Sequence, residues 1–115
     1  MFDLDSVVEN EAEINDLEEV VMGLIVNSGQ ARSLAYTALK IAKTGDFEKA
    51  WELMDQSRLA VNEAHLVQTK LIEADQGEGK TKVSLVLVHA QDHLMTSMLA
   101  RELVTELIEL HEKIK

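Results

Sequence analysis

The chain has no proline among its 115 residues and only five glycines, so almost nothing in it would interrupt a long helix. Proline is the residue that a helix interior tolerates least, and glycine is the next. Good helix formers are abundant instead, notably alanine, leucine, glutamate and lysine. We therefore predict an all-α protein, and a chain of this length is expected to form one domain around a single core.

The helical spacing of the apolar residues and two turn signals divide the chain into three predicted helices. These run from Asp16 to the turn at Thr44, from about residue 47 to about residue 74, and from about residue 81 to residue 114. At the first turn, Gly45 suits a left-handed C-cap and Asp46 suits the N-cap of the next helix. The second turn is the polar, glycine-rich segment 75–79. Short connections make neighbouring helices antiparallel, so residues 16–115 are predicted to form a three-helix up-down-up bundle.

Residues 1–15 precede the first predicted helix and differ from it in composition. They are acidic, contain no basic residue and show no clean apolar period. We therefore predict that this segment is a mobile N-terminal tail, and we assign no functional site to it.

The charge balance excludes several classes of partner and chemistry. Eleven basic residues against twenty-one acidic ones leave a formal net charge of −10, which disfavours binding to nucleic acid or to an anionic membrane surface. The absence of cysteine rules out disulfides, thiolate zinc sites and cysteine nucleophiles. No signal peptide and no apolar run long enough to cross a bilayer are apparent, so we expect a cytoplasmic protein without membrane insertion.

The third predicted helix is unusually apolar. Between Val83 and Ala100 the only ionisable side chains are His89, Asp92 and His93. A helix that is apolar on most sides must be covered on more than one side, whereas two partner helices cover only one flank. The remaining apolar surface predicts self-association, most simply with further copies of the chain.

One stripe of this helix has the spacings of three and four that are typical of a coiled-coil seam. Its residues are Leu85, Val88, Asp92, Met95, Leu99 and Leu103. In a symmetric oligomer packed along this stripe, Asp92 would face its own copies, and at ~4 Å with an effective dielectric of ~20 each ionised pair would repel by roughly 4 kcal/mol. Shared protons or a hard divalent cation such as Mg²⁺ or Ca²⁺ would relieve the repulsion. The alternative is that Asp92 points to solvent.

His89, Asp92 and His93 share one side of the helix because their spacing is i, i+3, i+4. A zinc hydrolase is one interpretation, but the usual third ligand and a glutamate base are missing. We expect His93, like His65, to be a hydrogen-bonded core residue, and His111 to be structural or solvated. With no cysteine present, a neutral imidazole at His89 would be the best nucleophile in this segment near neutral pH, provided that it is exposed.

Residues 89–96, with the sequence HAQDHLMT, resemble the active-site signature of IIA proteins of the lactose/cellobiose family of the sugar phosphotransferase system. Further blocks that look like the same family are residues 29–33, 45–47, 63–65 and 68–69. The stretches 66–70 and 83–88 look closer to the N,N′-diacetylchitobiose branch than to the lactose branch. Ala90 points the same way, because the lactose type tends to have glycine there.

The resemblance implies a phosphotransferase component that carries phosphate during sugar uptake. The histidine matching His89 would receive a phosphoryl group from the phosphocarrier HPr and pass it to a cysteine of a separate IIB protein. The resemblance also implies a homotrimer with a helical, coiled-coil-like core and a divalent metal, expected to be Mg²⁺, held on the threefold axis by the residue matching Asp92. Composition and periodicity by themselves would favour a different reading, a non-catalytic helical oligomeric adaptor.

Overall fold

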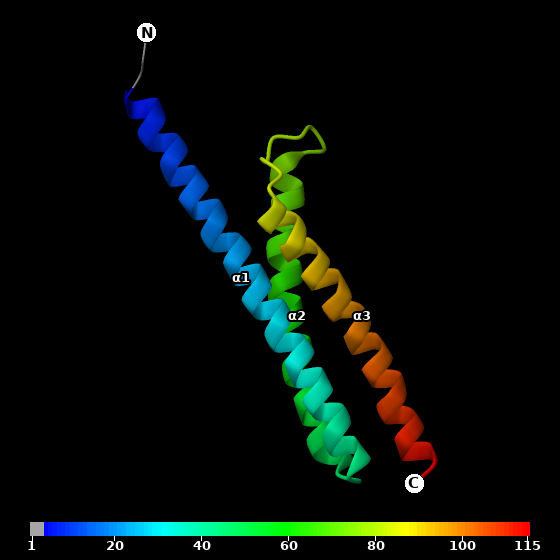
Figure 1. The fold of residues 1–115 in the computed structure, drawn as a ribbon. Coiled ribbons are helices and arrows are strands. Elements are labelled where there is room, and N and C mark those ends of the chain that lie inside the picture. The colour runs from blue at the N-terminus through cyan, green and yellow to red at the C-terminus, as the bar shows by residue number, and fades with distance from the viewer. Residues whose placement is uncertain (1–3) are drawn as a thin grey trace.

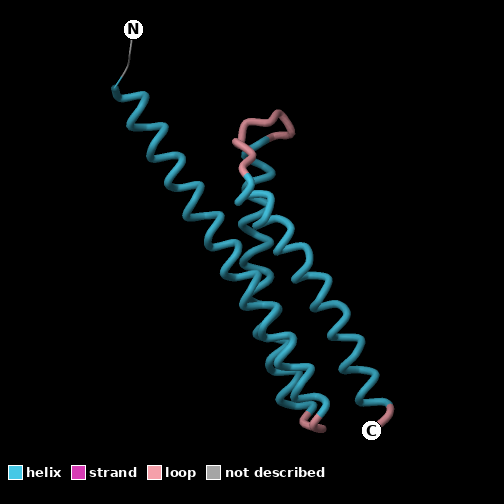
Figure 2. Tube along the Cα trace, in the orientation of Figure 1, coloured by secondary structure: helices cyan, strands magenta, loops and turns pink. Residues whose placement is uncertain are grey.

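A computed structural model describes the backbone of residues 4–115 and the side chains of residues 17–115. Its elements are α1 (Leu4–Lys43), α2 (Phe47–Asp75) and α3 (Leu85–Lys113). The helices alternate in direction and form an elongated bundle of 73 × 22 × 19 Å (Figure 1). Figure 2 shows the connections between them as short loops at opposite ends of the bundle. The prediction of an antiparallel three-helix architecture is confirmed for the described part of the chain.

The turn between α1 and α2 has the structure that its residues predict. Gly45 has φ +94°, in the left-handed region that glycine adopts without strain. The Asp46 side chain then accepts a hydrogen bond from the backbone N–H of Lys49 at 3.1 Å, which satisfies one free donor in the first turn of α2. These two residues therefore fix where α1 ends and where α2 begins.

The start of α3 was predicted wrongly. It lies at Leu85 and not near residue 81, because Ser84 is the N-cap and accepts from the N–H of Leu87 at 3.2 Å. The preceding segment is held outside the helix by Asp75, whose carboxylate accepts from the N–H of Thr81 at 2.8 Å and of Gly79 at 3.2 Å. Asp75, the last residue of α2, thus binds backbone N–H groups of the loop, including that of Thr81, which the sequence pattern assigned to the next helix.

The Asp75 carboxylate gives a pH-dependent prediction. The N–H groups of Thr81 and Gly79 hold the pKa of Asp75 below its ordinary value of 3.8. Because the folded pKa is depressed, the stabilisation is complete above about pH 3.8 and is lost as the pH falls through the lower folded value. Carbon NMR should find the titration midpoint of this carboxyl below 3.8. In thermal melts, the difference between wild type and Asp75→Asn should shrink on acidification, and a difference that does not change with pH would contradict the assignment.

The start of α1 also differs from the sequence prediction. The helix begins at Leu4, not near Asp16, and so includes most of the segment predicted to be a separate tail. The acidic residues of that segment are compatible with helix, and no proline or glycine separates them from the rest of α1. The predicted helix boundary was therefore wrong. The side chains of residues 1–16 lie outside the described part, and the mobility of the segment stays a prediction.

Small residues let the helices approach closely in the core. Buried alanines recur along α1 at Ala31, Ala35, Ala38 and Ala42. The largest completely buried side chains are Leu24, Leu94 and Ile108. One cluster of the core, which joins Leu24 of α1 to Leu94 of α3, lies directly beneath the segment that contains His89 and His93. This packing fixes the backbone that carries the candidate site.

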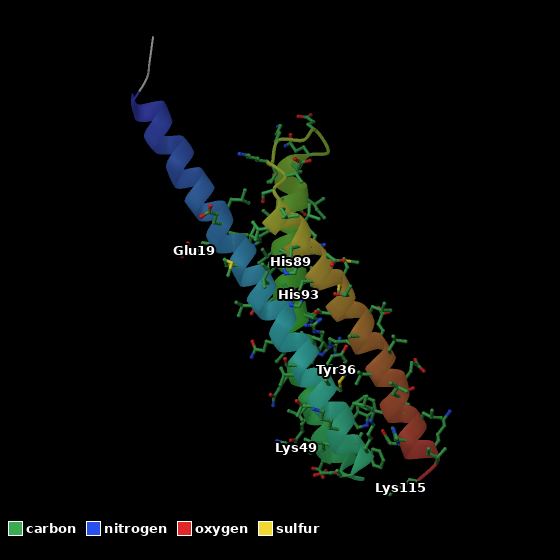
Figure 3. All side chains as sticks on the ribbon, viewed as in Figure 1. Glu19, Tyr36, Lys49, His89, His93 and Lys115 are labelled. Carbon is green, nitrogen blue, oxygen red and sulfur yellow. The ribbon has the colours of Figure 1, made fainter. Side chains whose placement is uncertain are left out.

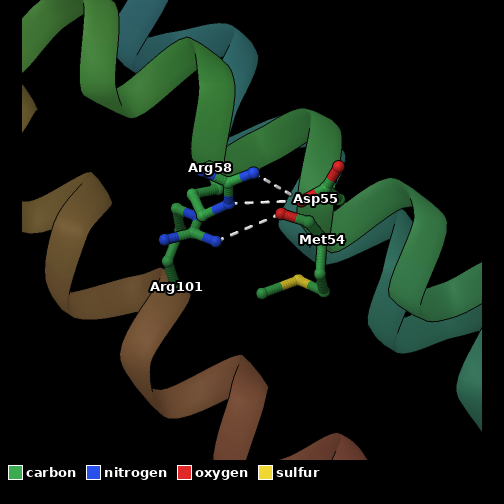
Figure 4. A network of polar contacts seen from close by, with 4 residues as sticks. All are labelled: Met54, Asp55, Arg58 and Arg101. Carbon is green, nitrogen blue, oxygen red and sulfur yellow. Dashed lines mark hydrogen bonds and ion pairs between the residues drawn. The ribbon is translucent and has the colours of Figure 1, made fainter.

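A polar contact joins all three helices near the middle of the bundle. Arg101 of α3 donates through Nε to Ser57 Oγ at 2.8 Å. It also donates through Nη2 to the carbonyl oxygen of Met54 at 3.1 Å (Figure 4). The Ser57 hydroxyl in turn donates to the carbonyl oxygen of Ala31 on α1 at 2.6 Å. Figure 4 also shows Arg58, which pairs with Asp55 on the exposed side of α2. The two arginines are close in space but differ in burial.

We expect Arg101→Ala to lower the free energy of unfolding by about 1.5–3 kcal/mol, because it removes two charge-assisted hydrogen bonds from a half-buried site. Arg58→Ala is the matched control, since exposed ion pairs contribute roughly 1 kcal/mol or less. Urea denaturation of the two variants measures both values. If the two variants lose equal free energy of unfolding, the contact of Arg101 with α2 contributes no more to stability than an exposed ion pair.

Candidate functional site

His89 lies in the second turn of α3 and its side chain is exposed. Its chain neighbour Ala90 and the nearby Leu87 are buried in the core, so the helix face below the imidazole is fixed while the ring itself stays open. A nucleophile must be reachable by its partner, and the exposure of His89 meets that condition. The structure therefore leaves the predicted acceptor accessible within one chain.

His93 follows His89 by one turn and lies against α1. The two rings stack with centroids 5.9 Å apart and an angle of 14° between their planes. A Cβ at Gly29 of α1 would lie 3.3 Å from His93 Nε2, so the missing side chain makes room for this ring. Figure 3 shows both histidines where α3 passes beside α1. His93 is thus held between α1 and the ring of His89.

The surroundings of His93 favour its neutral form. Burial lowers its pKa from the ordinary 6.5, the positive charge of Arg32 lowers it further, and His89 adds to the same effect. Asp92 acts in the opposite direction. His93 is half-buried and makes no side-chain hydrogen bond with the residues described, so the prediction of a hydrogen-bonded core residue was wrong for it.

The remaining histidines lie away from this pair. His65 on α2 is exposed, so the prediction of a hydrogen-bonded core residue was wrong there. Its position falls on the solvent side of α2, one residue after the buried Ala64. His111 is half-buried in the last turn of α3, where Lys113 is a second basic residue near the negative end of the helix dipole. Neither contributes to the candidate site.

Asp92 is exposed in the single chain, within an apolar stripe that is exposed as well. The apolar members of the stripe are between 50% exposed, at Val88, and 86% exposed, at Leu85. They continue along α3 through Met95, Leu99 and Leu103. An apolar row of this length is uncommon on the surface of a monomeric protein and suits contact with another chain.

The metal prediction depends on more than one copy of the chain. Among the side chains that the structure describes, no three His, Asp or Glu residues gather closely enough to hold a metal ion. His89, Asp92 and His93 therefore do not form the zinc site that the spacing allowed. Asp92 is exposed in the single chain, and a metal site shared between copies of the chain stays a prediction.

Two features of the site were missed in the sequence. Gln68 of α2 is buried and its amide donates to the Gln91 side chain on α3, next to Asp92. Arg32 of α1 is half-buried and acts electrostatically on His93. The signal for Arg32 was available, because Ile25 and Ala35 place it beside the apolar face of α1 at helical spacing.

None of the described helices combines the length and the apolar character needed to span a bilayer.

Comparisons with known proteins agree on one family. The model of the family described as "PTS system, Lactose/Cellobiose specific IIA subunit" matches residues 19–112. Over 115 residues the chain is 76% identical to the PTS system N,N′-diacetylchitobiose-specific EIIA component of Escherichia coli K12, with 100% of this chain and 99% of that protein covered.

Solved structures of IIA proteins also resemble this chain in fold and in sequence. The IIA(Chitobiose)–HPr complex of the Escherichia coli phosphotransferase system contains a chain with 83% sequence identity and a TM-score of 0.76, with 85% of this chain and 95% of that chain covered. The cellobiose-specific enzyme IIA of Bacillus anthracis is 45% identical, with a TM-score of 0.81 and coverage of 84% and 89%.

Proposed function

This chain belongs to the lactose/cellobiose-specific IIA family of the phosphotransferase system, and from that premise we propose that it is the cytoplasmic IIA phosphocarrier of an N,N′-diacetylchitobiose or cellobiose-type sugar system. It accepts a phosphoryl group on His89 and passes it on during sugar uptake. The observation that carries this proposal is the exposed imidazole of His89, on a rigid helix and within the segment 89–96 that resembles the family's active site.

The chemistry requires little more than an accessible nitrogen. A lone pair on a ring nitrogen of His89 forms a bond to phosphorus as the bond from phosphorus to the donor breaks on the opposite side. The reverse movement delivers the group to the next carrier. A neutral imidazole is suited to both steps. Its nitrogen lone pair attacks phosphorus in the first step, and in the second the N–P bond breaks and the ring leaves with that electron pair as the acceptor attacks.

The proposed partners are HPr as the donor and a cysteine of a IIB protein as the acceptor. A related chain with 83% identity has been solved in complex with HPr, which supports the first of these. The part of α3 around His89 also suits docking with two different partners in turn, because His89, Asp92 and His93 are the only ionisable groups between Val83 and Ala100. Few salt bridges would then have to form and break at each exchange.

We further propose that three copies pack along the exposed stripe of α3 and form a homotrimer. The apolar side chains of that stripe would be buried, and Asp92 of each chain would lie near the threefold axis. Carboxylates from three copies would hold a divalent cation there, and Mg²⁺ fits oxygen ligands. The cation offsets the repulsion between the carboxylates. His89 lies one turn before Asp92 on α3. We expect its ring to face the outer surface of the trimer, where HPr can reach it.

The direct test is incubation with phosphoenolpyruvate, enzyme I and HPr, followed by measurement of the intact mass. One acid-labile phosphate per chain supports a carrier. Subsequent addition of candidate IIB proteins identifies the acceptor as the one that removes the phosphate. If no phosphate is gained, the exposed stripe is better explained by a non-catalytic helical adaptor.

A further inference from the structure

The backbone of α3 offers few hydrogen-bond donors to a phosphoryl group on His89. The site lies within α3, where backbone N–H groups already donate to carbonyl oxygens of the preceding turn. The chain carries a net charge of −10, and Asp92 lies one turn away on the same side of α3. Additional negative charge on a phosphate is therefore unfavourable unless a cation or a hydrogen-bond donor lies close to it.

Such a donor is found on the neighbouring helix. Gly29 and Arg32 are three residues apart on α1 and so lie on the same side of that helix. Gly29 marks the point where α1 meets His93, since its Cβ would lie 3.3 Å from His93 Nε2. The ring of His93 stacks on that of His89 at 5.9 Å between centroids. Arg32 consequently lies on the side of α1 that faces His93, whose ring in turn stacks on that of His89.

The guanidinium of Arg32 is available for a ligand. The chain has three arginines, and two of them already have partners: Arg58 donates to Asp55, and Arg101 donates to Ser57 and to Met54. Arg32 makes no hydrogen bond and no salt bridge with the side chains described, although it is half-buried. A guanidinium presents five donors in a planar arrangement that matches phosphate oxygens.

We propose that Arg32 is a further catalytic residue, whose guanidinium donates hydrogen bonds to the oxygens of the phosphoryl group on His89 of the same chain. This role rests on the proposed phosphocarrier function. During transfer, Arg32 stabilises the charge on the equatorial oxygens while the bond to His89 forms or breaks. It changes neither the atoms transferred nor the proton count.

The test compares Arg32→Met with Arg58→Met and Arg32→Lys. Quench-flow labelling from phosphorylated HPr should show a rate about a hundredfold lower in Arg32→Met, at the lower end of what one positioned donor contributes. Arg58→Met should keep the wild-type rate, since Arg58 pairs on α2 with Asp55. Arg32→Lys should recover part of the rate, because lysine keeps the charge but loses the planar fork.

A second readout separates direct contact from a structural effect. A neighbouring guanidinium favours the dianionic form of the phosphoryl group, so the phosphorus NMR titration of the phosphorylated protein should have a higher midpoint in Arg32→Met than in wild type. A lower rate with an unchanged midpoint would overturn the proposed contact. If the wild type accepts phosphate and Arg32→Met accepts it at the same rate, the role of Arg32 is overturned and the carrier function stands. Failure of the wild type to accept phosphate would overturn both.

Discussion

His89→Ala should fold normally and accept no phosphate from phosphorylated HPr. The imidazole is exposed, so its removal leaves the core unchanged, and the free energy of unfolding should stay within about 0.5 kcal/mol of wild type. Phosphoryl transfer should be lost altogether, because alanine offers no nucleophile. Intact mass after incubation with phosphoenolpyruvate, enzyme I and HPr measures the loss, and thermal denaturation verifies the fold.

His65→Ala is the matched control for this experiment. His65 is also an exposed histidine, but it lies on α2 and has no contact with the His89–His93 pair in the described structure. The control should gain one phosphate per chain, as wild type does. Full labelling of His89→Ala would place the acceptor elsewhere in the chain and refute the assignment of the site.

We expect the proposed homotrimer to persist in Asp92→Leu, and this variant to unfold at a higher temperature than wild type when no divalent metal is present. The substitution removes the carboxylates that would face one another on the axis and replaces them with apolar surface. Each ionised pair at ~4 Å costs roughly 4 kcal/mol at an effective dielectric of ~20. Relief of even a fraction of this repulsion should raise the thermal midpoint by about 4 °C or more. Calorimetry in the presence of a chelator and analytical ultracentrifugation measure the two outcomes.

Glu63→Leu provides the comparison for Asp92→Leu. Glu63 is an exposed carboxylate of α2 outside the stripe, and removal of its charge should leave stability within about 0.5 kcal/mol of wild type. Added Mg²⁺ should raise the midpoint of wild type and of Glu63→Leu but not that of Asp92→Leu. A monomeric Asp92→Leu variant, or one that unfolds earlier than wild type, would show that Asp92 does not lie among its copies.

The first turn of the fold could be predicted from local chemistry. Gly45 and Asp46 mark the first turn by their own conformational and capping preferences, and the structure has the turn there. The start of α3 was missed although Ser84 is a local capping signal, and the bond from the N–H of Thr81 to Asp75 across the loop is not visible in the sequence. The start of α1 was missed for another reason, since the acidic composition of its first turns was interpreted as disorder although it permits helix.

The candidate site was predictable only in part. The spacing of His89, Asp92 and His93 fixes that they share one side of α3, and their proximity is evident from the sequence alone. The contact of His93 with Gly29 and the position of Arg32 depend on how α1 and α3 are aligned along the bundle. Helical periodicity gives the face of each helix but not this alignment, because many registers bury the same apolar residues.

The central claim is that His89 carries the phosphate, and NMR of the phosphorylated wild-type protein with nitrogen-15-labelled histidines tests it most directly. The chain has four histidines, whose ring nitrogens can be distinguished by this method. The account predicts coupling to phosphorus at a single ring nitrogen, on His89, with the other three rings uncoupled. Coupling at His65, His93 or His111 instead would contradict it.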